Sequence, residues 1–330
     1  TTLWAARAVR AVWAVTATAG CDVGPRADFE PPQVHVVETR PADGDGTRCA
    51  DSDPDCGVSR RPRIVVRYDR PLWPEPERFG EVWVHTGRAG VRITSARYDV
   101  LDRTLSYELG PRLRPRTLYR VELADPAEGF TPRAYDGAEV ARGAVPLEFS
   151  FLTQDEGAAP EEEVLEAPVP SCARIAALLD RHCGDCHGPD RPAMGLTLNS
   201  PEGLRATAIQ RVARQTETGN DSGVPSLHPP RFGTAMPVIE PGKAAGSYLV
   251  YKLLSGSARF EPCRSADCAE LADQPGAEAC EAWPELERER LRDWFVRGSA
   301  MPPEYSEAPR LDCASLRALL RFIDDGARCP

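Results

Sequence analysis

A five-residue motif, Cys183-Gly184-Asp185-Cys186-His187, constrains this chain more than any other stretch of its sequence. Two thiols at this spacing, at the end of a helix, can add to the two vinyl groups of one porphyrin. The imidazole that follows then lies under the ring, where it can ligate the iron. The motif therefore predicts one covalent c-type haem held by Cys183 and Cys186, with His187 as an axial ligand.

A redox-active C-x-x-C and half of a zinc site are the alternatives for these two cysteines. A thioredoxin-like motif needs a βαβ setting, and a zinc site needs a second pair of ligands nearby. The sequence shows neither, so haem attachment is the better interpretation.

The second axial ligand has to come from elsewhere, and the chain has only three methionines. Met194 follows His187 too closely to cross easily to the other haem face. Met301 stands between two predicted helices and precedes two prolines, which make a stiff, non-helical loop that can hold sulfur towards iron. We favour Met301, with Met236 as the alternative and an open site as a further one. His228 is better explained as a histidine of a surface loop.

Residues 1–20 have the features of a secretory leader: Arg7 and Arg10 are followed by an apolar run too short to span a bilayer. The ending Thr18-Ala19-Gly20-Cys21 resembles the lipobox of bacterial lipoproteins, and ordinary cleavage is the alternative. The resemblance implies a lipid on Cys21, with residues 21–31 as a tether. We therefore expect a periplasmic or cell-surface protein anchored to a bacterial membrane.

Eleven cysteines also favour an oxidising compartment. If Cys21 carries lipid and Cys183 and Cys186 carry haem, an even number remains, and these can all pair as disulfides. Close spacing favours Cys49–Cys56 and Cys263–Cys268. The other candidates are Cys172, Cys280, Cys313 and Cys329.

Residues 32–153 contain about seven short alternating runs separated by turn residues, a pattern typical of a β-sandwich. The runs are 34–37, 64–68, 82–85, 91–98, 104–109, 118–123 and 147–152. Segments 41–44, 63–72, 113–119 and 149–153 resemble the bacterial Ig-like domains of surface proteins, which implies a structural or spacer module. The aspartates around Cys49 and Cys56 lack the bidentate Glu of a calcium loop, so we expect no Ca²⁺ site.

Residues 154–170 are acidic and contain prolines, which predicts an extended linker. The sequence after the linker predicts three helices. Ser171 caps the first, which runs into the haem motif, and Pro284–Arg297 forms the second. Asp312 begins the third, which stops at Gly326. Together these elements predict a multidomain chain, an N-terminal all-β Ig-like sandwich plus a C-terminal all-α cytochrome c-like domain over 171–330.

The C-terminal part resembles a longer class I cytochrome c subfamily described from planctomycetes. The residues that carry the resemblance are 183–187, 195–198, 238–243, 247–253, Met301-Pro302-Pro303 and 322–327. It implies that the Met-Pro-Pro segment supplies the distal ligand, Met301.

These features predict a mono-haem c-type cytochrome lipoprotein that carries electrons outside the cytoplasm and is not an enzyme. Its partners would be an unidentified redox protein and, through Cys21, a membrane. The net charge of −10 argues against nucleic acid. The alternatives are a ligand-binding or peroxidase-like haem protein with an open sixth position, and a structural surface protein.

Overall fold

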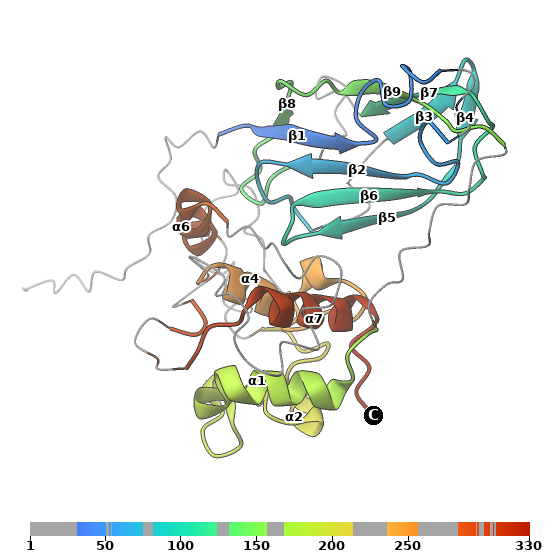
Figure 1. Ribbon diagram of the computed structural model, residues 1–330. Helices are drawn as coiled ribbons and strands as arrows, with labels where there is room; N and C mark the ends of the chain where they lie inside the picture. The colour runs from blue at the N-terminus through green and yellow to red at the C-terminus, as the bar shows by residue number, and fades with distance from the viewer. Residues whose placement is uncertain are drawn as a thin grey trace, which may run out of the picture.

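The computed structural model describes residues 32–50, 53, 55–74, 82–123, 132–156, 168–213, 236–256, 283–294, 296, 300–303, 306 and 308–330. In these parts the strands occupy one half of the molecule and most of the helices the other (Figure 1). The predicted leader and tether with Cys21, residues 157–167 of the linker, His228 and the Cys263–Cys268 pair lie outside the described residues.

Within the described ranges, nine strands form two sheets. The five-stranded sheet has the order β5-β6-β2-β1-β8, and the four-stranded sheet has the order β4-β3-β7-β9. The strands are β1 (Val34–Arg40), β2 (Arg63–Tyr68), β3 (Val82–Thr86), β4 (Ala89–Val91), β5 (Ile93–Asp99), β6 (Thr104–Leu109), β7 (Leu118–Leu123), β8 (Val140–Ala141) and β9 (Glu148–Leu152). Neighbours pair antiparallel except β1 and β8, which pair parallel.

The strands follow the alternation of the sequence because successive side chains point to opposite faces of a sheet. In β2, Ile64, Val66 and Tyr68 are buried and the residues between them are more exposed. The run predicted as one strand over 91–98 is two strands in different sheets, since β4 pairs with β3 and β5 pairs with β6. Alternation alone does not reveal this change of partner.

The α-helices are α1 (Cys172–His187), α2 (Pro201–Thr207), α4 (Tyr248–Leu254), α6 (Glu285–Trp294) and α7 (Cys313–Asp324), with short 3-10 helices η3 (Ala193–Gly195) and η4 (Ala244–Gly246). The side chain of Ser171 accepts a hydrogen bond from the Arg174 N–H, and that of Asp312 accepts one from the Ser315 N–H. Both N-caps were predicted from the sequence, and each satisfies a backbone donor at the start of its helix.

The predicted fold class, an all-β Ig-like sandwich plus a separate all-α cytochrome c-like domain, is wrong. The described residues are mainly β-sheet with short, scattered helices, and no all-α domain stands apart within them. The domain boundaries at 153 and 171 stay a prediction. The physical reason for the error is that the apolar faces of the helices do not pack only against one another.

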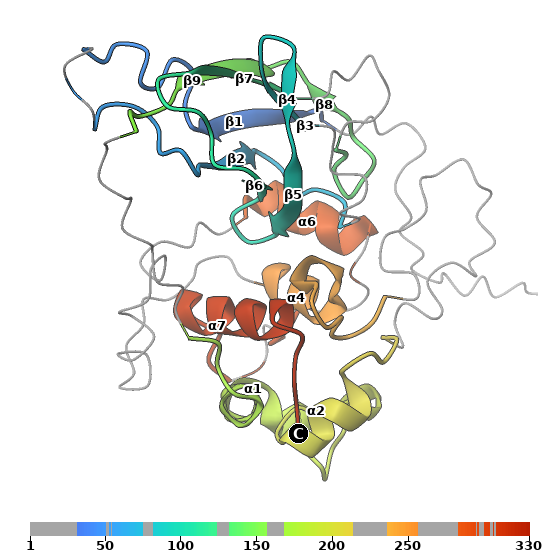
Figure 2. The same ribbon diagram turned by 90° about the vertical axis from the view of Figure 1, so that its right-hand side faces the viewer.

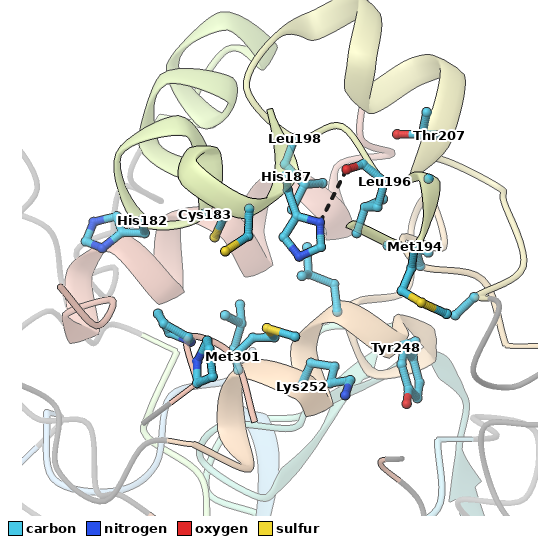
Figure 3. Close-up of a pocket in the computed structure, with 18 of the residues that line it drawn as sticks. His182, Cys183, His187, Met194, Leu196, Leu198, Thr207, Tyr248, Lys252 and Met301 are labelled. Atoms are coloured by element: carbon cyan, nitrogen blue, oxygen red, sulfur yellow. Dashed lines mark hydrogen bonds between the residues drawn. The ribbon is translucent and has the colours of Figure 1, made fainter. Parts of the chain in front are cut away.

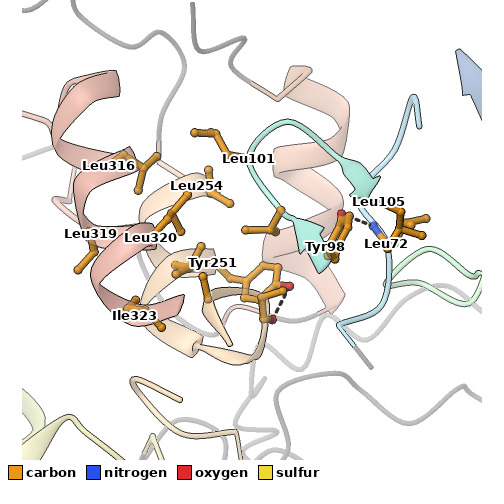
Figure 4. Close-up of a cluster of buried hydrophobic side chains, with 14 of the residues drawn as sticks. Leu72, Tyr98, Leu101, Leu105, Tyr251, Leu254, Leu316, Leu319, Leu320 and Ile323 are labelled. Carbon is orange, nitrogen blue, oxygen red and sulfur yellow. Dashed lines mark hydrogen bonds between the residues drawn. The ribbon is translucent and has the colours of Figure 1, made fainter. Parts of the chain in front are cut away.

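The helices share their core with the β5–β6 turn (Figure 4). Leu101 in this turn is buried, and it lies beside Leu254 of α4 and Leu316 of α7. The hydroxyl oxygen of Tyr98 in β5 accepts a 2.8 Å hydrogen bond from the Leu72 N–H, which fixes the end of this strand. A turn that would otherwise be solvated is thus part of the interior.

Ion pairs also join the two halves. Arg317 of α7 makes a bidentate contact with Asp102 of the β5–β6 turn, with Nη2 2.9 Å from Oδ1 and 3.0 Å from Oδ2. Arg97 of β5 lies 2.7 Å from Asp324 at the end of α7. These contacts fix the orientation of α7 relative to the five-stranded sheet.

The most buried of these contacts is centred on Arg70, just after β2. Its guanidinium lies 2.5 Å from Asp136 and 2.8 Å from Glu287 of α6, and all three side chains are less than a tenth exposed. The Tyr135 hydroxyl donates to Glu287 Oε2 at 3.0 Å. Burial alone would lower the pKa of Arg70, but hydrogen bonds and charges from Glu287 and Asp136 outweigh it and raise the pKa.

Replacing Arg70 by Met should lower the free energy of unfolding by about 3–5 kcal/mol, because it leaves two carboxylates buried without their cation. Arg133→Met is the control, since Arg133 and Glu139 form an exposed pair and the change should cost no more than about 1 kcal/mol. Urea unfolding measures both. Equal losses in the two variants would contradict a stabilising role for the Arg70 cluster.

Candidate cofactor pocket

The C-x-x-C-H motif, residues 183–187, forms the last turns of α1. Cys183, Cys186 and His187 face a cavity of about 310 Å³ (Figure 3). The cavity is lined mostly by apolar groups, from α1, the segment after it, the end of α2, α4 and the segment that carries Met301. Its walls include Cys183, Cys186, His187, Met194, Leu196, Leu198, Val238, Leu249, Lys252, Leu253, Met301 and Pro302.

His187 is buried on one wall of this cavity. Its Nδ1 lies 3.3 Å from the carbonyl oxygen of Leu196, which can only accept, so Nδ1 carries the proton and donates it. Burial lowers the pKa of His187, with a smaller contribution from the charge of Lys252, against the raising effect of the Leu196 and Ala193 carbonyls. The ring is therefore neutral at neutral pH, and its Nε2 lone pair can bind a metal.

The chain after α1 folds back to make that hydrogen bond. Leu198 N–H donates to the His187 carbonyl at 2.8 Å, which brings the segment alongside the end of the helix. A Cβ on Gly188 would lie 2.6 Å from the Gly184 carbonyl oxygen, so the turn out of α1 needs glycine at this position.

Met301 lies on the wall opposite His187, next to Lys252 of α4 (Figure 3). The structure thus brings together four residues singled out in the sequence: Cys183, Cys186, His187 and Met301. Met236, the alternative ligand, is buried but is not among the residues that line the cavity. Met194 lines it at an exposed edge.

The cysteines divide into two classes within the described residues. Cys49–Cys56 is a disulfide, as its spacing predicted, and Cys172–Cys329 ties the first turn of α1 to the end of the chain. Cys313 is also disulfide-bonded. Cys183 and Cys186 are the free thiols of this part of the chain.

Two residues of the cavity had no assigned part in the sequence analysis. Lys252 is buried, and burial lowers its pKa to about 8. His182 is buried beside Cys183, and its Nδ1 faces the carbonyl of Pro309 at 2.6 Å. The helical spacing of Tyr248, Leu249, Lys252 and Leu253 was the available signal for Lys252, because these positions share one face of a helix.

The residues present fit a covalently attached haem. Two free thiols sit beside an imidazole with a free Nε2, and a thioether lies across an apolar cavity. A haem iron takes its equatorial ligands from the porphyrin and needs only axial ligands from protein. Within the described ranges, no three or more His, Cys, Asp or Glu side chains are grouped to hold a metal ion.

No model of a known protein family matches this chain, and no curated protein matches it. Among solved structures, the S-layer protein rSbsC(31-844) is similar over 42% of this chain at 11% sequence identity. The match spans only 16% of that protein's chain, with a TM-score of 0.24, which is too low to support a conclusion about fold or function.

Among the described helices, none has the length and apolarity needed to cross a membrane.

In the haem-free chain, Cys186 should react with iodoacetamide at pH 8 at least about tenfold faster than Cys183. Burial, aided by the charge of Cys186, raises the pKa of the Cys183 thiol to about 12, whereas Cys186 is exposed. Only the thiolate is nucleophilic, so the Cys183 rate should also rise about tenfold from pH 8 to pH 9. Peptide mass spectrometry under non-reducing conditions measures both rates; equal rates would show that Cys183 is not desolvated.

Proposed function

We propose that this chain is a mono-haem c-type electron carrier that acts outside the cytoplasm. The observation that carries the proposal is the juxtaposition of two free thiols, the imidazole of His187 and the thioether of Met301 around one apolar cavity. When bound, the haem supplies an iron that cycles between Fe(II) and Fe(III).

The side chains have distinct parts in this proposal. Cys183 and Cys186 form the thioether bonds, and His187 ligates through Nε2 because Leu196 holds its Nδ1–H. Met301 supplies sulfur from the opposite wall, which favours the reduced iron and raises the potential. The apolar lining excludes water and strengthens the same preference, since it disfavours the extra charge of the oxidised iron.

The cavity has a side from which electrons can be exchanged. Cys186 and Met194 are exposed, so their edge of the cavity reaches the protein surface, where a redox partner protein can approach. We include in the proposal that the protein is exported and anchored through lipid on Cys21. The disulfides support export, because they persist in oxidising compartments.

Expression after export, in a host that attaches haem to c-type proteins, tests the proposal. The purified protein should carry one covalent haem with a low-spin spectrum and a weak ferric band near ~695 nm from methionine ligation. A high-spin spectrum, or rapid CO binding without displacement of a ligand, would instead indicate an open sixth position and reject the electron-carrier assignment.

The double variant Cys183→Ser/Cys186→Ser should lose all covalent haem, since it lacks both attachment points. Haem staining of denatured protein and its intact mass measure this. Cys49→Ser/Cys56→Ser is the matched control: it also removes a cysteine pair, but one that does not line the cavity, and should keep the haem. Covalent haem retained by the first variant would reject the attachment site.

Met301→Leu should keep the covalent haem but lose the ~695 nm band, bind CO faster and have a lower reduction potential, because the sulfur ligand is removed. Met236→Leu and Met194→Leu are controls, because each replaces a methionine that is not the proposed axial ligand. Both should keep the band. Loss of the band in Met236→Leu but not in Met301→Leu would reverse the ligand assignment.

A further inference from the structure

The imidazole of His182 is buried but takes no part in the proposed attachment or ligation. It precedes Cys183 on α1, and Figure 3 shows it at the end of the cavity away from His187. Its Nδ1 lies 2.6 Å from the carbonyl oxygen of Pro309. A carbonyl oxygen can only accept, so His182 donates a hydrogen bond to the segment that carries Met301.

That segment has little regular structure of its own in the described residues between 300 and 310, so contacts from elsewhere must fix its path. At its first end, the Met301 N–H donates to the carbonyl of Lys252 at 3.2 Å. The segment also packs closely against Gly256, which has no side chain. A Cβ at that position would lie 3.0 Å from Ala300 Cβ and 3.3 Å from the Met301 carbonyl oxygen.

The second end is held by side chains. Arg310 donates a hydrogen bond from Nη1 to the Gly256 carbonyl. This contact holds the second end of the segment against the residues that follow α4. The His182–Pro309 hydrogen bond differs from all these contacts because it comes from α1, the helix that bears Cys183, Cys186 and His187.

We infer that His182 is a positioning residue for the sixth ligand: through Pro309 it ties the Met301 segment to the helix that would fix the porphyrin. This inference rests on the proposed function. A single rigid element then sets both the plane of the ring and the distance to the opposite wall. Without the hydrogen bond, the Met301 segment can move relative to α1, and the iron–sulfur contact weakens.

His182→Asn and His182→Leu form a matched pair. The Asn amide nitrogen lies near the place of Nδ1 and can still donate to Pro309, whereas Leu keeps apolar bulk and removes the donor. Both variants should retain covalent haem. His182→Leu should lose most of the ~695 nm band and bind CO about tenfold faster, while His182→Asn should resemble the unaltered protein.

A second measurement tests the effect of the His182–Pro309 hydrogen bond on the Met301 segment without relying on the iron spectrum. Amide hydrogen exchange of the described residues Ala300, Met301, Ser306, Ala308 and Arg310 should be about tenfold faster in His182→Leu than in the unaltered protein or His182→Asn. His182→Gln moves the donor to the position of Nε2, so it should behave like His182→Leu and replaces it if that variant does not fold. His85→Leu, which changes a histidine of β3, should alter none of these readouts.

Unchanged exchange and an unchanged ~695 nm band in His182→Leu or His182→Gln would overturn the inference. So would equal losses in His182→Asn, because packing of the ring rather than its hydrogen bond would then hold the segment. If the unaltered holoprotein lacks the band, the proposed Met301 ligation fails first, and a positioning role for His182 falls with it.

Discussion

The complete burial of α4 is the constraint on which most of this structure depends. All seven of its residues, Tyr248 to Leu254, are buried. One side packs with Leu101 of the β5–β6 turn and with α7, and the other lines the cavity through Tyr248, Lys252 and neighbouring residues (Figures 3 and 4). A helix buried on both sides fixes the cavity relative to the sheets, since neither packing surface can shift without disturbing the other.

The same helix explains how an irregular segment can place a ligand. The Met301 N–H donates a hydrogen bond to the Lys252 carbonyl, and the Met301 backbone packs against Gly256. The position of Met301 is therefore set by α4. α1 closes the opposite wall, and the Cys172–Cys329 disulfide ties its first turn to the C-terminus after α7. The view in Figure 2 shows α1 and α2 as the layer farthest from the strands, with α4 and α7 between.

Charge reinforces these apolar contacts where the halves meet. Arg317 with Asp102, Arg97 with Asp324, and Arg70 with Glu287 each join a helix to a residue of the β-rich half. Of these three contacts the Arg70 cluster is the most buried, so removing its cation should be the most destabilising change. The β-rich half is therefore packed onto the helices and is not merely attached to them by a linker.

What the sequence determined by itself was local. Periodicity and capping residues located α1 and α7, alternation located most strands, and short separation identified the Cys49–Cys56 disulfide. The C-x-x-C-H spacing likewise needs only one helix end to place its thiols and imidazole together. Tertiary structure alone decided the shared core, the Cys172–Cys329 pair, the placement of Met301 rather than Met236 opposite His187, and the contact of His182 with Pro309. Each of these joins residues far apart in the chain, and a pattern of neighbouring residues cannot show which apolar faces will meet.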